Sequence, residues 1–178
     1  MIPSGAPAAL LACMYLCAAT LMLCVPLLPL GLSPAAPLTP DLLFALTAAW
    51  VQRRPDSLPV FLILPVFLLA DFILGRPPGL WTLLVLFVTE FLRLQASGQH
   101  DRPFVVEWVM VAGTLGGALF VFLLVLKLAL APHPAVPTLV ELWAVTVATY
   151  PIIVFLLTCL FRVRAPETPS SDRLGGTL

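Results

Sequence analysis

Charged residues are scarce in this chain of 178 amino acids. Asp, Glu, Lys and Arg together make up 10% of it, against about 25% in an average soluble domain, and 61% of the residues are apolar. The mean hydropathy is +1.07. A composition so poor in charge excludes an ordinary water-soluble domain, and it predicts that lipid surrounds most of the chain.

Basic residues are few as well. There are nine, balanced by nine acidic residues, so the formal net charge is zero. Nucleic-acid binding requires a concentrated basic face, which arginines spread over short loops do not form, so nucleic acid is excluded as a partner. No Lys or Arg precedes Arg53, so the positively charged start of a secretory signal peptide is missing. We expect the first segment to be retained as a membrane helix.

Residues that carry out chemistry are also rare. The two histidines, His100 and His133, fall in separate loops, and the sequence offers no Ser/His/Asp set and no glycine-rich phosphate loop. We therefore expect neither an enzyme nor a bound metal or cofactor. The cysteines lie in apolar runs, where a thiol packs like a small hydrophobe. Cys13 and Cys17 share a helix face, but without His or carboxylate partners packing is preferred over a metal or redox role.

Six apolar runs, separated by proline-rich and charged turns, determine the expected fold. They cover residues 8–30, 38–51, 58–74, 79–95, 104–131 and 136–161. A helix that crosses a membrane needs roughly 20 such residues, and the prolines and glycines of the connections place the helix ends. We expect an all-α polytopic membrane protein with about six transmembrane helices in one domain, residues 1–162, followed by a disordered cytoplasmic tail, residues 163–178.

The distribution of basic residues predicts the orientation. With a cytoplasmic N-terminus and six crossings, only Arg76 and Lys127 lie outside, and the other seven basic residues lie inside, as the positive-inside rule requires. Both termini are then cytoplasmic. An alternative concerns the second run, whose 14 residues span only about 21 Å as a helix. If that run does not cross, the N-terminus alone moves outside.

Ionisable side chains within the membrane-embedded region are the candidate functional residues, because each is costly in hydrocarbon. The six-helix arrangement sorts them into two polar layers around an apolar middle. The outer layer is expected to bind a partner or to form buried polar contacts, and it contains Asp41, Asp71, Arg76, Lys127 and Glu141. The inner layer includes Arg53, Arg54, Glu90, Arg93 and Glu107.

Three of these carboxylates suit their helix positions and one does not. Asp41, Glu107 and Glu141 open helices, where the helix dipole favours a negative charge. Asp71 falls at a helix C-terminus, where the dipole disfavours it. Arg76 or a partner protein could compensate it. Its role is therefore open between an intrachain structural contact and a site that faces a partner.

Contacts between helices are expected at two further features, and four tryptophans are expected to mark the helix ends. Lys127 and Glu141 can pair across the fifth and sixth helices. Gly113 and Gly117 form a small-xxx-small pattern that lets another helix approach closely, with packing inside the chain preferred over dimerisation. The tryptophans fall near predicted helix ends and are expected to form interfacial belts, and they are Trp50, Trp81, Trp108 and Trp143.

The segment from Pro37 to about Gln95 carries motifs of a known family. Pro40-Asp41-Leu42-Leu43 opens the second helix, and the third helix ends with Leu68-Leu69-Ala70-Asp71 before a turn that reaches Gly79. These motifs resemble the family of the rod shape-determining membrane protein MreD. The resemblance points to Asp41 and Asp71 as functional residues, with Pro40 and Gly79 as neighbours that set the local geometry.

The resemblance implies a non-enzymatic scaffold or regulator of cell shape in the bacterial cytoplasmic (inner) membrane, acting in the lateral peptidoglycan synthesis complex, the elongasome. The implied partners are the single-span protein MreC, the elongation transglycosylase and transpeptidase and, indirectly, the actin-like MreB. The implied fold is similar to the substrate-binding subunits of energy-coupling-factor transporters. Two alternatives stay open: the substrate-binding subunit of a vitamin-type transporter, and a membrane enzyme that uses Asp41 or Asp71.

Overall fold

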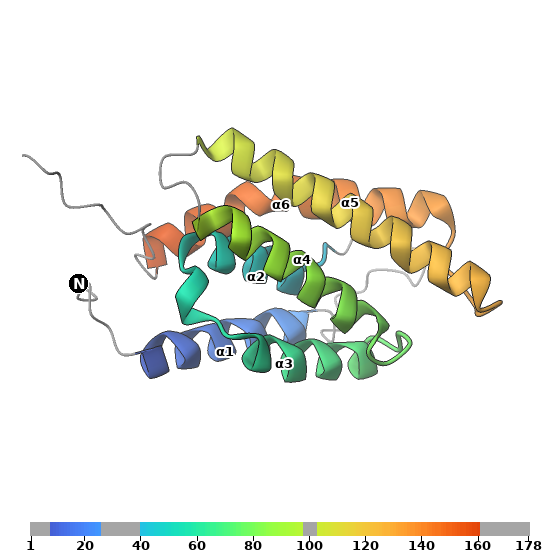
Figure 1. The fold of residues 1–178 in the computed structure, drawn as a ribbon, viewed down its shortest axis with the longest axis horizontal. Helices are drawn as coiled ribbons and strands as arrows, with labels where there is room; N and C mark the ends of the chain where they lie inside the picture. Colours follow the sequence, from blue (N-terminus) through green and yellow to red (C-terminus); the bar gives the residue numbers. More distant parts are fainter. Residues whose placement is uncertain (1–7, 26–39, 98–102, 161–178) are drawn as a thin grey trace, which may run out of the picture.

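The computed structural model describes residues 8–25, 40–97 and 103–160, and every regular element in these ranges is helical (Figure 1). The elements are α1 (Ala8–Cys24), α2 (Leu42–Arg53), the short 3₁₀ helix η2 (Pro55–Ser57), α3 (Val60–Ile73), α4 (Leu80–Ser97), α5 (Phe104–Leu128) and α6 (Val136–Leu160). The all-α prediction is confirmed, and each apolar run corresponds to one α-helix. The expected extension of the first helix to residue 30, His100 and the tail from residue 163 lie outside the described residues.

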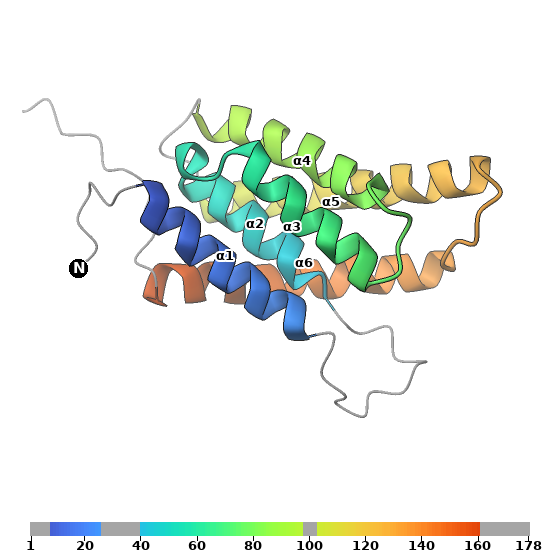
Figure 2. The same cartoon turned by 90° about the horizontal axis from the view of Figure 1, so that it is seen from below.

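The α-helices lie in three layers of two along the long axis of the molecule (Figures 1 and 2). One outer layer holds α1 and α3, the middle layer holds α2 and α4, and the other outer layer holds α5 and α6. Helices within each outer layer contact one another, and each outer layer contacts the middle one.

The central helix of the bundle is α2. It packs against α1, α4 and α6, and the nine consecutive side chains from Leu43 to Val51 are buried. A helix that is apolar on all sides needs such a setting, because it has no polar face to turn outward. Its 12 residues span only about 18 Å. The shortest of the six apolar runs therefore forms the core of the bundle.

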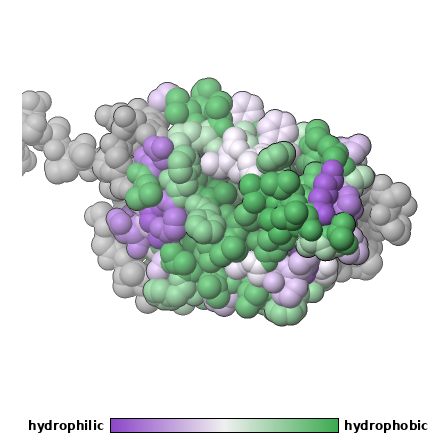
Figure 3. Space-filling model, turned by 45° about the vertical axis from the view of Figure 1, so that its right-hand side comes forward, coloured by the Kyte–Doolittle hydropathy of each residue, from purple (hydrophilic) through white to green (hydrophobic). Residues whose placement is uncertain are grey.

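The outer surface of the bundle is largely apolar. Phe61, Phe87, Phe120 and Phe155 are between 64% and 76% exposed, and Figure 3 shows a broad hydrophobic area between hydrophilic residues at either end. Among the described helices, α5 and α6 are long and apolar enough to cross a membrane, whereas α1 and α3 are apolar but shorter. The protein is thus all-helical with two candidate membrane spans, and the six transmembrane helices expected from the sequence are not confirmed.

Two tryptophans join α5 to α6 through reciprocal hydrogen bonds. Trp108 of α5 donates its indole N–H to the carbonyl of Val147 at 2.9 Å, and Trp143 of α6 donates to the carbonyl of Ala112 at 2.8 Å. Pro151 lies inside α6 and has no N–H to offer to Val147, four residues before it. The indole of Trp108 therefore supplies the donor that the proline removes.

The other two tryptophans are core residues. Trp50 and Trp81 are almost completely buried. Trp50 packs edge-on against Tyr15, and Trp81 packs between Phe44 and Phe122. The expectation of an interfacial belt was wrong for these two, because closeness to a helix end does not distinguish a side chain that faces outward from one that faces a neighbouring helix.

Candidate functional site

Polar side chains gather at both ends of α2. We call the group at its N-terminus the Asp41 cluster, which contains Asp41, Asp71, Arg76, Trp81 and Thr146. The group at its C-terminus is the Arg53 cluster, which contains Arg53, Glu107 and Tyr150. The Asp41 cluster contains three residues of the expected outer polar layer, Asp41, Asp71 and Arg76, and the Arg53 cluster contains two of the inner layer, Arg53 and Glu107.

Asp41 links three parts of the chain. Its Oδ1 accepts a hydrogen bond from the backbone N–H of Phe44 at 3.0 Å, which caps the N-terminus of α2 as expected. Its own backbone N–H donates to Thr146 Oγ1 of α6 at 2.9 Å. Its Oδ2 lies 3.3 Å from Nη1 of Arg76, in the turn between α3 and α4. Asp41 therefore holds the start of α2 against two neighbouring segments.

The side chain of Arg76 forms two contacts in this cluster. It pairs with Asp41 rather than with Asp71, and its guanidinium lies over the ring of Trp81, 5.2 Å from the centroid. An arginine in this position is attracted by the negative face of the indole. The Arg76 side chain is 24% exposed, so the ion pair lies at the rim of the bundle.

Asp71 is fully buried, and it caps α4. Its Oδ2 accepts hydrogen bonds from the backbone N–H of Gly79 at 2.9 Å, from the backbone N–H of Thr82 at 3.2 Å and from Thr82 Oγ1 at 2.8 Å. Asp71 lies in the last turn of α3, but its carboxyl group reaches the N-terminus of α4, where the helix dipole favours an acidic side chain. The sequence left two roles open for Asp71. The burial of its side chain matches the intrachain structural contact and not a site that faces a partner.

The turn between α3 and α4 brings Asp71 to its partners. Gly75 and Gly79 have φ angles of +62° and +87°, a region that glycine adopts without the steric cost other residues have. The chain reverses between them, so that the N–H of Gly79 points at Asp71. Gly79 therefore sets the geometry of this turn. Pro40 is the other residue that was expected to set the local geometry. Its carbonyl oxygen accepts a hydrogen bond from the backbone N–H of Leu42 at the start of α2.

The Arg53 cluster joins α2, α5 and α6. Arg53 Nη1 lies 2.9 Å from Glu107 Oε1 and also donates to the carbonyl of Ala49 at 3.0 Å. Tyr150 of α6 donates its hydroxyl hydrogen to the same Glu107 oxygen, and its ring stacks on Phe104. The sequence placed Glu107 at a helix start but did not indicate Tyr150. The only available signal was a lone tyrosine before a proline in an apolar run.

Lys127 and Glu141 are not paired. Both side chains are exposed, and the described residues form no ion pair between them. On α5 the buried seam runs through Phe122 and Leu126, so Lys127, one residue later, projects away from it. Lys127 lies in the last turn of α5, where the helix dipole favours a cation. The expected pairing was wrong because it considered distance along the helices and not the direction of the side chains.

The glycines of α5 also behave differently from the expectation. A Cβ added to Gly113 or Gly117 would meet no other atom within 4 Å, so neither glycine lies at a close contact inside the chain. A Cβ on Gly116 would lie 3.2 Å from Nε1 of Trp143. Gly116 is therefore the glycine of this group that lies at a close contact within the chain, and the preference for intrachain packing at Gly113 and Gly117 was wrong.

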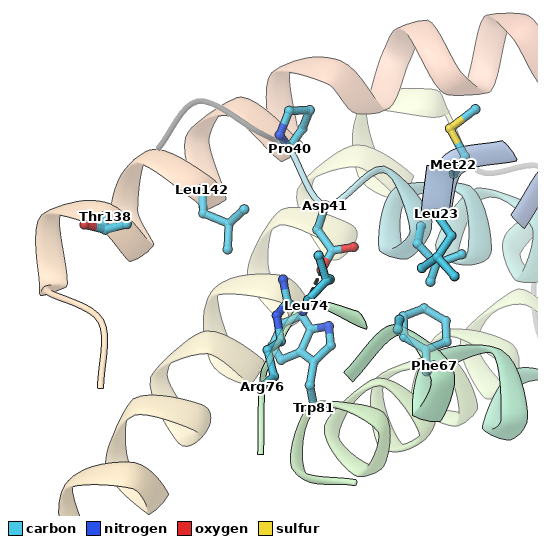
Figure 4. Close-up of a pocket in the computed structure, with 12 residues that line it drawn as sticks. Met22, Leu23, Pro40, Asp41, Phe67, Leu74, Arg76, Trp81, Thr138 and Leu142 are labelled. Atoms are coloured by element: carbon cyan, nitrogen blue, oxygen red, sulfur yellow. Dashed lines mark hydrogen bonds and ion pairs between the residues drawn. The ribbon is translucent and has the colours of Figure 1, made fainter. Parts of the chain in front are cut away.

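A cavity of about 220 Å³ lies beside the Asp41 cluster (Figure 4). Its walls come from α1, α2, α3, α4 and α6, and its charged lining residues are Asp41 and Arg76. A second cavity, of about 270 Å³, shares four of the same lining residues, Arg76, Trp81, Thr138 and Leu142. The two cavities therefore meet at Arg76 and Trp81.

The acidic side chains of the two clusters act as helix caps and as an ion-pair partner. In the described part of the chain, no group of three His, Cys, Asp or Glu side chains could hold a metal ion. Cys13 and Cys17 are free and exposed. Asp41 and Asp71, which could have formed an acid and base pair, each cap a helix instead. These geometries favour a role in holding helices together.

Comparison of the chain with protein-family models, with curated proteins and with solved structures gives no match in any of the three. The functional assignment therefore depends on the residues of the chain itself.

Proposed function

We propose that the protein is a membrane-embedded scaffold that acts by helix–helix association within the lateral peptidoglycan synthesis complex. The resemblance of the segment from Pro37 to Gln95 to the MreD family supports the assignment. In this proposal the protein lies in the bacterial cytoplasmic membrane with all six helices embedded and both termini cytoplasmic. Its partners are an MreC-like single-span protein and the elongation transglycosylase and transpeptidase, with MreB engaged indirectly.

The short α2 is compatible with this arrangement. A helix of about 18 Å cannot cross a hydrocarbon core of about 30 Å in contact with lipid. The buried α2 does not need to, because its neighbours separate it from lipid and non-spanning backbone is tolerated where protein surrounds it. Ion pairs at both ends fix it in place. The bundle can therefore present a stable surface to partners.

An open apolar hollow between α4 and α5 carries the proposal. It measures about 330 Å³, and its lining residues are Leu84, Phe87, Val88, Phe91, Thr114, Gly117, Ala118 and Val121. Gly117 is exposed there, and Gly113 lies one turn away on the same helix. In lipid, helices associate through close packing at small residues, because apolar surface gains nothing by leaving lipid. The transmembrane helix of a single-span partner suits such a hollow.

The test is affinity purification of the tagged chain from its own host in mild detergent, with mass spectrometry of the proteins recovered. We expect an MreC-like protein or the wall-synthesis enzymes. Gly117→Leu fills the hollow and should lower their recovery about tenfold, equivalent to about 1.4 kcal/mol. Ala144→Leu adds nearly the same bulk, one carbon less, at an exposed position of α6 and should leave recovery unchanged. Equal recovery with both variants contradicts the proposal.

The second candidate function is the substrate-binding subunit of a small-molecule transporter. The cavity beside Asp41 and Arg76 favours it, because such a subunit needs a polar pocket between helices. The same purification distinguishes the two candidates. Recovery of an ATPase pair with a transport module, in place of wall-synthesis proteins, supports the transporter.

A further inference from the structure

The cavity beside the Asp41 cluster contains hydrogen-bond donors that the described residues do not use. Nε1 of Trp81 is buried and has no hydrogen-bond partner among the described residues. Arg76 gives one N–H to Asp41, at 3.3 Å, whereas a guanidinium carries five. Buried donors in native proteins are nearly always satisfied, so an unused one in a cavity wall indicates a ligand.

Trp81 and Arg76 are neighbours in the cavity walls. Trp81 and Arg76 line both cavities, and the guanidinium of Arg76 lies over the indole of Trp81. In Figure 4 the indole nitrogen lies on the side of the Trp81 ring that faces Phe67, within the circle of lining residues. A single acceptor group between Arg76 and Phe67 could therefore approach both donors.

The charge of the cavity selects the ligand class. Arg76 is already neutralised by Asp41, whose side chain is 7% exposed. A carboxylate or phosphate would add a negative charge beside Asp41 in a largely apolar space, and desolvating that charge is costly. An uncharged carbonyl or ester oxygen accepts the same hydrogen bonds without this cost. The remaining walls are mostly apolar, and they include Met22, Leu23, Phe67, Leu74 and Leu142.

We propose that the two adjoining cavities bind an uncharged molecule with an apolar chain and a carbonyl or ester head, which accepts hydrogen bonds from Trp81 Nε1 and Arg76. Their volumes, about 220 and 270 Å³, together reach the range of small-molecule sites, about 300–1,000 Å³. An acyl ester of a membrane lipid and a free ester share this chemistry. This binding site does not depend on the scaffold proposal, because it involves neither the hollow between α4 and α5 nor a partner protein.

The probe is a medium-chain fatty-acid methyl ester that carries a photoreactive diazirine at the end of its chain. After irradiation of the full-length protein in detergent, mass spectrometry of peptides locates the labelled residues. We expect saturable labelling of Met22, Leu23 or Leu142, displaced by the unlabelled ester and not by an alkane of equal length. Labelling confined to outward-facing residues such as Phe87 and Phe120 overturns the proposal.

Two kinds of variant distinguish the contribution of the hydrogen-bond donor from that of the cavity space. Trp81→Phe removes one donor and should weaken displacement by the unlabelled ester about fivefold, the usual effect of one hydrogen bond. Trp143→Phe makes the same change outside both cavities and should leave displacement unchanged. If Trp81→Phe does not fold, Leu142→Trp fills the cavity from α6 without altering the indole. Unchanged cavity labelling in folded Leu142→Trp overturns the site.

Two further arms identify the ligand class and its source. The corresponding fatty-acid anion should displace the probe less well than the ester, and stronger displacement by the anion overturns the assignment of an uncharged head. The labelling is then repeated in nanodiscs, where diacyl phospholipid is in large excess. Loss of cavity labelling there supports the site with a bilayer lipid as occupant, and persistence supports it with a smaller free molecule.

Discussion

Asp71 is expected to be a stability residue, and Asp71→Ala should lower the free energy of unfolding by about 3 kcal/mol. Removing a helix cap costs about 0.5–2 kcal/mol, and leaving a buried donor without an acceptor costs about 1–3 kcal/mol. Both costs apply, because one oxygen of Asp71 accepts from the N–H of Gly79 and from the N–H and hydroxyl of Thr82. The side chain is fully buried, so water cannot replace it easily.

The assay is denaturant unfolding in mild detergent, combined with hydrogen exchange at the start of α4. The amides of Gly79 and Thr82 should exchange faster in Asp71→Ala. Asp71→Asn keeps an acceptor oxygen and should lose only about 1 kcal/mol, and Asp56→Ala removes an exposed carboxylate and should change stability by less than about 0.5 kcal/mol. Unchanged unfolding and exchange in Asp71→Ala, together with lost partner recovery, would refute the cap and favour a partner-facing role.

Two other predictions concern the helix contacts. Arg53→Met leaves the Glu107 carboxylate without its ion-pair partner, at a site where the two side chains are 11% and 18% exposed, and should lower the free energy of unfolding by about 3 kcal/mol. A double-mutant cycle with Glu107→Gln should give a coupling above about 1 kcal/mol, and additive effects would contradict the pair. Gly116→Leu should lower the thermal midpoint because its Cβ meets the Trp143 ring, whereas Gly117→Leu, with open space around it, should not. Equal midpoints would exclude this contact.

The element pattern could be predicted from the sequence because hydrophobic runs and proline clusters are local signals. All six runs correspond to helices, and Asp41 caps α2 as its position after Pro40 suggested. The burial of α2 could also have been suspected, since the run from Leu43 to Val51 has no polar face. The extent to which the helices cross a membrane does not follow from these signals, because a central helix and a spanning helix are both apolar.

Contacts between distant segments could not be predicted in this way. The partner of Asp71 is the start of the next helix, which depends on how the turn at Gly75 and Gly79 folds back. The partner of Arg53 is 54 residues away in sequence, and Tyr150 joins it from a third helix. Side-chain direction decides such pairs, and a list of charged positions does not contain it. The same limit explains why Lys127 and Glu141 were paired wrongly.

The position of α2 has a consequence for biogenesis. Among the six described α-helices, α2 is the second to be synthesised. The residues that pair with the charges at its two ends are synthesised later, because Arg76 follows Asp41 by 35 residues and Glu107 follows Arg53 by 54. Its last packing partner, α6, is the final helix of the bundle. A nascent chain must therefore keep a short apolar segment with a charge at each end sheltered until α6 has been synthesised, and a chaperone that binds apolar segments could provide this shelter.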